Sequence, residues 1–165
     1  MSGRGIQESE FIPPQAPDAV SKRSLRAWLY LIKCSKELDQ AMSERFRLYY
    51  QSSLSRFDVL AHLDLAGEQG LSTSVLAGKL LASKGNITRL LDRMEQDGLI
   101  IRHQHSHDKR VHHVCLSGKG AELFSKMAPD HERWAYEILS VLDSREQSEL
   151  VRLLKTVRSR LEGVL

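Results

Sequence analysis

The stretch from Ser83 to Gly98 constrains the fold of this sequence more than any other. Four apolar residues within it fall at positions i, i+3, i+4 and i+7, the spacing of one buried face of an α-helix. They are Ile87, Leu90, Leu91 and Met94. Ser83 is placed to cap the first turn, and Gly98 is placed to end the helix in the left-handed conformation. The stretch therefore predicts an amphipathic helix with one polar face turned outward.

The polar face of this helix carries side chains that suit a DNA duplex. Asn86 and Arg89 offer the paired hydrogen-bonding groups that read adenine and guanine edges, and Arg93 flanks them. Lys84 and Thr88 suit contacts with phosphate oxygens. On this helix alone, the alternative is an ordinary solvated amphipathic helix, so its neighbours in the sequence decide between the two interpretations.

Positive charge is concentrated around the same stretch. The chain has 165 residues and a formal net charge of +3. Residues 71–116 hold seven Lys and Arg against four Asp and Glu, so they carry the whole excess. A local excess of this size is the modest electrostatic signature of a nucleic-acid-binding surface.

Helical periodicity extends over most of the remaining chain. Residues 1–20 contain three of the four prolines and are predicted to form a mobile arm. Before the central stretch, we expect one long helix over residues 21–50, a second helix from near Ser55 and a short third helix over residues 72–81. After it, we expect a helical segment from residue 118 with a kink or break near Pro129. A last helix is expected to be capped by Ser144 and Gln147.

The periodicity changes to that of strands after Gly98. Residues 99–103 and 111–116 are typical of two strands, and a polar loop joins them. A short helix, the amphipathic helix and a β-hairpin in this order predict a winged helix-turn-helix, in a fold that is mostly α with a small β-wing. Lys109 and Arg110 at the wing tip suit phosphate or minor-groove contacts, and Asp108 is placed to hold Arg110.

The helices outside the winged unit carry apolar stripes that need a partner. We therefore predict that residues 21–50 and 118–165 form a helical dimerisation region and that residues 51–117 form the DNA-binding domain. A two-fold homodimer sets two recognition helices about one duplex turn apart, which predicts a pseudo-palindromic DNA site. The alternative is that these helices complete a monomeric core.

These motifs together resemble the MarR family of bacterial transcription regulators, from about Leu25 to Leu161. The resemblance rests on five stretches of sequence. They are Leu71-Ser-Thr-Ser-Val-Leu-Ala-Gly-Lys-Leu80, Asn86-Ile-Thr-Arg-Leu-Leu-Asp-Arg-Met94, Asp97-Gly-Leu99, Asp108-Lys-Arg110 and Leu116-Ser-Gly-Lys-Gly120. In the last of them, Ser117 replaces the threonine that is usual in the family and keeps a hydroxyl that can cap a helix.

The resemblance implies a triangular homodimer that binds double-stranded DNA and usually represses a nearby gene. A small molecule, often phenolic, then releases the DNA by filling a cleft between the dimer helices and the winged unit. By position, Asn86, Thr88 and Arg89 take the groove-reading role. Ser83 and Lys84 stand at the helix entry, and Arg110 takes the wing role.

Two shorter stretches of sequence resemble one particular branch of this family. Arg56-Phe-Asp-Val-Leu60 and Gly85-Asn-Ile-Thr88 are similar to the branch associated with catabolism of aromatic and hydroxycinnamic acids. That branch implies an effector that is an aromatic acid or its coenzyme A thioester. Residues that could line its cleft are Trp28, Tyr49, Phe57 and His62. Aromatic side chains at helical spacing also fit a plain hydrophobic core, so both interpretations stay open.

Other classes of protein fit the sequence less well. No phosphate-binding loop, nucleophile elbow or paired-histidine motif is present, so we expect no enzyme, no cofactor and no metal site. Cys34 and Cys115 are predicted to be reduced thiols, and a thiol sensor at Cys34 is one alternative. A helical adaptor without DNA binding is another. Neither a signal peptide nor a membrane-spanning run is recognisable, so we expect a cytoplasmic protein without membrane contact.

Overall fold

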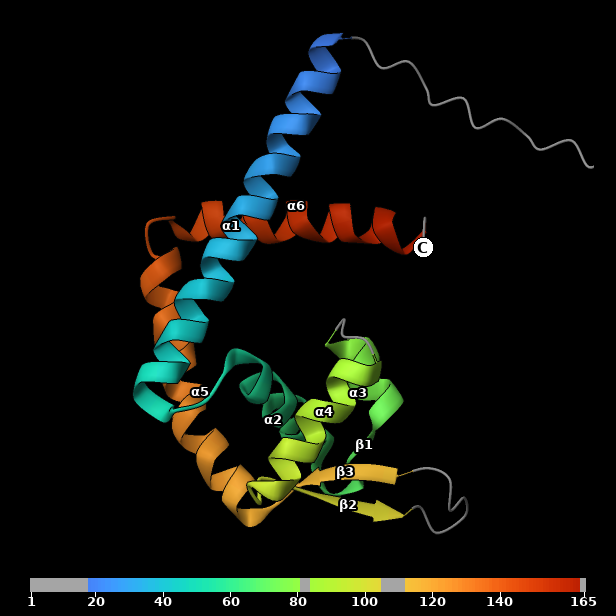
Figure 1. Ribbon diagram of the computed structural model, residues 1–165. Helices are drawn as coiled ribbons and strands as arrows, with labels where there is room; N and C mark the ends of the chain where they lie inside the picture. The colour runs from blue at the N-terminus through green and yellow to red at the C-terminus, as the bar shows by residue number, and fades with distance from the viewer. Residues whose placement is uncertain (1–17, 81–83, 105–111, 164–165) are drawn as a thin grey trace, which may run out of the picture. The chain divides into compact units, whose positions relative to one another are not determined.

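The computed structural model describes residues 18–80, 84–104 and 112–163 (Figure 1). This part of the chain is mostly helical, with a small antiparallel sheet, which confirms the predicted fold class. Its elements are α1 (Asp18–Tyr50), α2 (Leu54–Ala66), the 3-10 helix η1 (Gly67–Gln69), β1 (Leu71–Ser72), α3 (Thr73–Lys79), α4 (Lys84–Gln96), β2 (Ile100–Gln104), β3 (His112–Leu116), α5 (Gly118–Leu139) and α6 (Ser144–Glu162).

The chain divides into two units after Gln40, and each is described by itself. The first unit contains the N-terminal part of α1, whose side chains are exposed from Lys22 to Gln40. The second unit runs from residue 41 to the end and contains all later elements. The helix predicted from residue 21 begins three residues earlier, at Asp18, and residues 1–17 of the predicted arm lie outside the described residues. None of the described helices is long and apolar enough to cross a membrane.

The core of the second unit is apolar and joins α1, α2, α4 and α5. Within the described residues, no polar or charged side chain is buried. The largest fully buried side chains are Phe46, Leu60, Leu63, Leu76, Ile87, Leu91, Met94, Met127, Val59 and Val114. Three of the four apolar residues predicted on α4 are thus completely buried, and Leu90 packs against the core as a half-buried residue.

The sheet has one strand more than the sequence predicted. β3 lies between β2 and the two-residue strand β1, and both pairings are antiparallel. Leu71 pairs with Val114, and Ile101 pairs with Cys115. A two-residue strand is too short for apolar alternation to show in a sequence. The predicted hairpin itself is confirmed, with bounds that differ by one residue.

One helix start and one helix cap differ from the predictions. α2 is capped by Ser53, whose side chain accepts a hydrogen bond from the Arg56 N–H, so the helix begins ahead of Ser55. α6 is capped by Asp143, which forms a capping box with Glu146 in place of the predicted Ser144 and Gln147. In both places a suitable side chain lies one or two residues earlier, and the longer helix forms more backbone hydrogen bonds.

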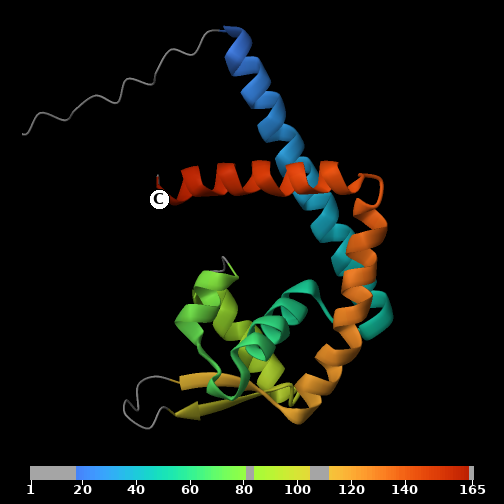
Figure 2. The ribbon, with the colours of Figure 1, turned by 180° about the vertical axis from the view of Figure 1, so that it is seen from behind.

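The sequence predicted a kink or a break near Pro129, and the break is absent. α5, orange in Figure 2, continues as one helix through this residue. Proline removes one backbone donor, but the helix is held on both sides because Met127 and Trp134 are buried in the core. The packing therefore overrides the local tendency to break.

A set of short contacts fixes the C-terminal end of α4. Gly98 has a φ of 72°, and the next N–H, of Leu99, donates to the carbonyl of Met94 at 2.8 Å. The carboxylate of Asp97 lies 2.5 Å from Arg56 of α2. These contacts hold the turn that joins α4 to the β-hairpin.

The start of α5 binds the same turn. Lys119 donates from Nζ to the Asp97 carbonyl at 2.7 Å, and the Ser117 hydroxyl donates to the Gly98 carbonyl at 2.6 Å. At Gly120, an added Cβ would lie 2.0 Å from the Leu99 carbonyl oxygen. Only glycine allows this approach, so the first turn of α5 is in direct backbone contact with the turn that follows α4.

We predict that Gly120→Ala lowers the free energy of unfolding by about 2–3 kcal/mol, because the methyl group meets backbone that cannot rotate away. Urea unfolding measures the change. The control is Gly118→Ala in the same first turn, where nothing lies within 4 Å of an added Cβ, and it should alter stability by less than about 1 kcal/mol. Equal effects of the two substitutions would contradict the steric explanation.

Candidate nucleic-acid interface

The outward face of α4 carries the predicted DNA-binding side chains. Asn86, Thr88, Arg89 and Arg93 are exposed, whereas the stripe on the opposite side is buried in the core. The sequence therefore predicted the rotation of this helix correctly. Lys84 is the first residue of α4, and Ser83 lies outside the described residues, so its capping role stays a prediction.

Arg89 and Asn86 form a pair on this face. Nη2 of Arg89 donates to Oδ1 of Asn86 at 2.8 Å, and Nε donates to the carbonyl of Gly85 at 3.4 Å. Both side chains line a shallow hollow of about 220 Å³ together with Leu90 and Arg93. An added Cβ at Gly85 would meet nothing within 4 Å, so packing within the described chain does not explain this glycine. The helix thus presents an amide and a guanidinium side by side, with open space at its first turn.

The wing is described only at its base. β2 and β3 pair in register from Ile100 with Leu116 to Gln104 with His112. The predicted wing-tip residues Asp108, Lys109 and Arg110 lie outside the described residues, so their roles stay predictions.

One charged residue at this base escaped the sequence analysis. Arg102, in the middle of β2, forms an ion pair with Asp92 of α4 at 2.6 Å. The available signal was a single basic residue in an apolar strand, directly after Leu99, Ile100 and Ile101.

The four predicted ligand-binding residues do not form one described group. Trp28 is exposed in the first unit, which is described by itself, and His62 is half-buried on α2. Tyr49 is 68% exposed, and its ring lies 5.6 Å from that of Trp134. Phe57 is buried, so its ring serves the core, as the alternative interpretation expected. Their binding role stays a prediction.

Phe57 belongs to an aromatic cluster that the sequence analysis missed. Its ring centroid lies 4.8 Å from that of Phe46, 5.7 Å from Phe124 and 4.5 Å from His131. Trp134 meets Phe46 edge to face at 5.2 Å. The cluster joins α1, α2 and α5, and periodicity within one helix cannot show which side chains of three different helices will meet.

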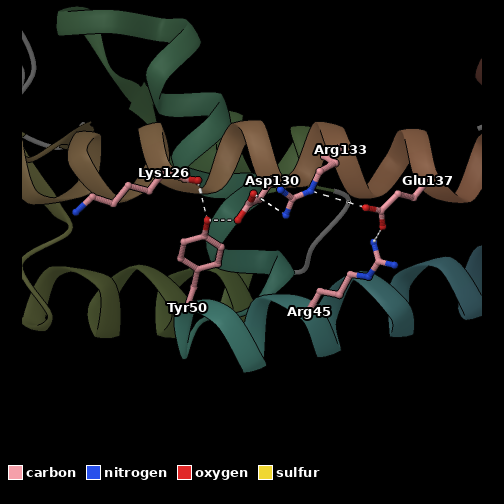
Figure 3. A network of polar contacts seen from close by, with 6 residues as sticks. All are labelled: Arg45, Tyr50, Lys126, Asp130, Arg133 and Glu137. Carbon is pink, nitrogen blue, oxygen red and sulfur yellow. Dashed lines mark hydrogen bonds and ion pairs between the residues drawn. The ribbon is translucent and has the colours of Figure 1, made fainter.

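A chain of polar contacts runs along the edge of this cluster (Figure 3). The Tyr50 hydroxyl oxygen lies 2.7 Å from the Lys126 carbonyl oxygen and 2.6 Å from Oδ2 of Asp130, so these two acceptors share its one proton. Asp130 pairs with Arg133, which reaches Glu137, and Glu137 in turn pairs with Arg45 at 3.0 Å. These contacts join the end of α1 to α5 along two turns of helix.

Burial raises the pKa of Tyr50 from 10.0 to about 12, and the hydrogen bond to Asp130 adds to the effect. A raised pKa in the folded state means that this group stabilises the protein fully below pH 10. The contribution is lost as the pH rises from 10 towards 12.

The geometry of α3, α4 and the β-hairpin defines a winged helix-turn-helix protein, in which the second helix of the pair is the one that enters a DNA groove. The sequence model of the MarR family matches residues 53–112, which span α2 to the start of β3. Over these residues the chain is similar to the MarR family, and the curated relatives that it resembles are HTH-type transcriptional regulators.

Similar proteins agree with this assignment over most of the chain. The HTH-type transcriptional regulator MhqR of Bacillus subtilis is 28% identical over 138 residues, which are 84% of this chain and 93% of MhqR. Two solved structures share the fold. One is Sco3205, a MarR family transcriptional regulator from Streptomyces coelicolor in complex with DNA, with a TM-score of 0.79, 19% identity and coverage of 90% of this chain and 92% of that one.

The second is the organohalide-sensing regulator RdhR-CbdbA1625 in its 2,4-dichlorophenol-bound form. It has a TM-score of 0.73 and 21% identity, and the match covers 90% of this chain and 88% of that one.

We predict that Tyr50→Phe lowers the free energy of unfolding by about 1 kcal/mol at pH 8, since it removes hydrogen bonds to Lys126 and Asp130. The difference from the unmodified protein should shrink between pH 10 and pH 12. Urea unfolding at pH 8, 10, 11 and 12 measures it. Tyr136→Phe, at a ring that is 70% exposed, is the control for loss of a tyrosine hydroxyl. A difference that stays constant up to pH 12 would contradict the role given to Tyr50.

Proposed function

We propose that this regulator binds a pseudo-palindromic site on double-stranded DNA as a homodimer and represses transcription until an aromatic effector releases it. The observation that carries the proposal is the outward face of α4, where Asn86, Thr88, Arg89 and Arg93 are all exposed. Such a protein acts where the DNA is, in the cytoplasm, and we assign it no catalytic step.

Each of these four side chains has a use on a duplex. The Asn86 amide and the Arg89 guanidinium have the fork geometry that reads base edges in the major groove. Thr88 and Arg93 suit phosphate contacts on either side. The solved structure of Sco3205 contains DNA, which supports the same use of the shared fold.

The exposed apolar stripe of α6 supports the proposed homodimer. Among the described residues of this helix none is buried. Its apolar stripe stays 37–53% exposed in the single chain and consists of Leu150, Leu153, Leu154, Val157 and Leu161. A large exposed apolar stripe marks an interaction surface. We therefore keep residues 21–50 and 118–165 as the proposed dimerisation region and residues 51–117 as the proposed DNA-binding domain.

The effector class is proposed from the sequence and from one similar structure. RdhR-CbdbA1625 binds 2,4-dichlorophenol, an aromatic molecule, on the same fold. The resemblance to regulators of aromatic catabolism suggests an aromatic acid or its coenzyme A thioester for this chain.

A fluorescence-anisotropy titration tests the function directly. The protein is titrated with duplex from its own upstream region and with random duplex, each with and without a panel of aromatic acids and their coenzyme A thioesters. Tight binding to the upstream duplex that one compound releases is the expected result. Equal affinity for random duplex would refute a sequence-specific regulator, and binding that no compound changes would refute the effector class.

We predict that Arg89→Ala weakens specific binding by about 1–3 kcal/mol and relaxes the preference at one base position in each half-site. The control is Arg47→Ala, which removes an exposed arginine paired with Glu44 on α1 and should leave the affinity within about 0.5 kcal/mol. The same titration measures both. If Arg89→Ala costs as much on random duplex as on the specific site, Arg89 contacts phosphate alone.

We predict that Leu153→Asp with Val157→Asp abolishes dimerisation and DNA binding together, because burying two carboxylates in an apolar interface is costly. Sedimentation velocity measures the first and anisotropy the second. The control is Ser148→Asp with Ser159→Asp, which adds the same charge to the opposite face of α6 and should leave a dimer. A monomeric double variant that still binds the full site tightly would disprove the dimer.

A further inference from the structure

Arg102 lies on the face of the β-hairpin that packs into the core. Its cross-strand partner is Val114, which is completely buried, and cross-strand partners share one face of a sheet. Ile100, two residues earlier in β2, lies on the same face and is 2% exposed. A charged side chain in this position reaches solvent only by extending its methylene groups past apolar neighbours.

The guanidinium of Arg102 forms ion pairs with two carboxylates of α4. Nη2 lies 2.6 Å from Oδ1 of Asp92, and Nη1 lies 3.4 Å from Oε2 of Glu95. Nε is buried and has no hydrogen-bond partner in the part of the chain that the structure describes. Since the five donors of a guanidinium are fixed in one plane, the two carboxylates set its orientation.

Asp92 and Glu95 stand beside the DNA-facing side of α4. Asp92 directly precedes Arg93 and follows Arg89 by one turn of the helix. Both carboxylates stay partly exposed, at 46% and 42%. The helix has only three basic residues, so two unpaired carboxylates would cancel most of its positive charge and repel phosphate.

We propose that Arg102 is a positioning residue for DNA binding. It neutralises Asp92 and Glu95, and it joins the base of the wing to the recognition helix. The inference rests on the proposed DNA binding but gives Arg102 no contact with DNA. Its effect on affinity passes entirely through the two carboxylates that it holds.

The test compares Arg102→Gln with the triple variant that also carries Asp92→Asn and Glu95→Gln. In anisotropy titrations at one low salt concentration, Arg102→Gln should bind the upstream duplex about tenfold more weakly, because two negative charges then face phosphate. The triple variant should regain affinity to within about twofold of the unmodified protein. A triple variant as weak as Arg102→Gln would overturn the proposal, since the arginine would then act on DNA directly.

A matched control separates local charge from net charge. Lys126→Gln removes one cation from α5, where Lys126 is paired with Glu122 at 2.6 Å, and it changes the net charge by the same amount. It should leave the affinity within about twofold. A loss as large as that of Arg102→Gln would show that net charge alone matters and would overturn the proposal.

A second measurement tests, without DNA, whether Arg102 and Asp92 interact. The urea midpoints of Arg102→Gln, Asp92→Asn and the double variant form a double-mutant cycle. The double variant should have a midpoint no lower than the lower of the two single variants, because either change already breaks the pair. Additive shifts would refute the pairing. If the unmodified protein shows no preference for any duplex, the proposed function fails, while this cycle still shows whether Arg102 holds Asp92.

Discussion

Burial of one apolar stripe of α4 is the constraint on which the outward polar face of this helix depends. Ile87, Leu91 and Met94 are at most 1% exposed. Burying such side chains is worth roughly 1.5–3 kcal/mol each, whereas an exposed ion pair contributes up to about 1 kcal/mol. A rotation of α4 by one residue, about 100°, would bring the stripe out of the core. The apolar core therefore decides which side chains of this helix face outward.

Polar and backbone contacts then fix α4 against its neighbours. Arg56 holds the Asp97 carboxylate, and the missing side chain of Gly120 lets α5 approach the Leu99 carbonyl. Along the helix, Arg102 connects the wing to Asp92. These contacts add little free energy individually, but each has a defined geometry. Because α2, α5 and β2 all hold α4 or the turn that follows it, movement of any of these elements is expected to reorient α4, which is the helix proposed to bind DNA.

Patterns local in the sequence predicted the fold well. Apolar spacing found α4 and its buried side, Gly98 marked its end, and the change of period after it found the hairpin. The errors arose where neighbouring residues compete or where packing overrides propensity. Ser53 caps α2 ahead of the predicted Ser55. α5 continues through Pro129 because the core holds it on both sides. The short strand β1 has no pattern of its own, and it exists because β3 offers it a partner.

The sequence by itself determined the fold class and which side chains of α4 face outward, because both depend on residues a few positions apart. Only the tertiary structure decided what lies around that helix. It places Arg102 on Asp92, joins Tyr50 to Asp130, and stacks Phe57 on Phe46. Tyr50 and Asp130 are far apart in the sequence, and even the nearer pairs come from different helices or strands. No spacing rule predicts such contacts, because they form only when separate elements pack onto one core.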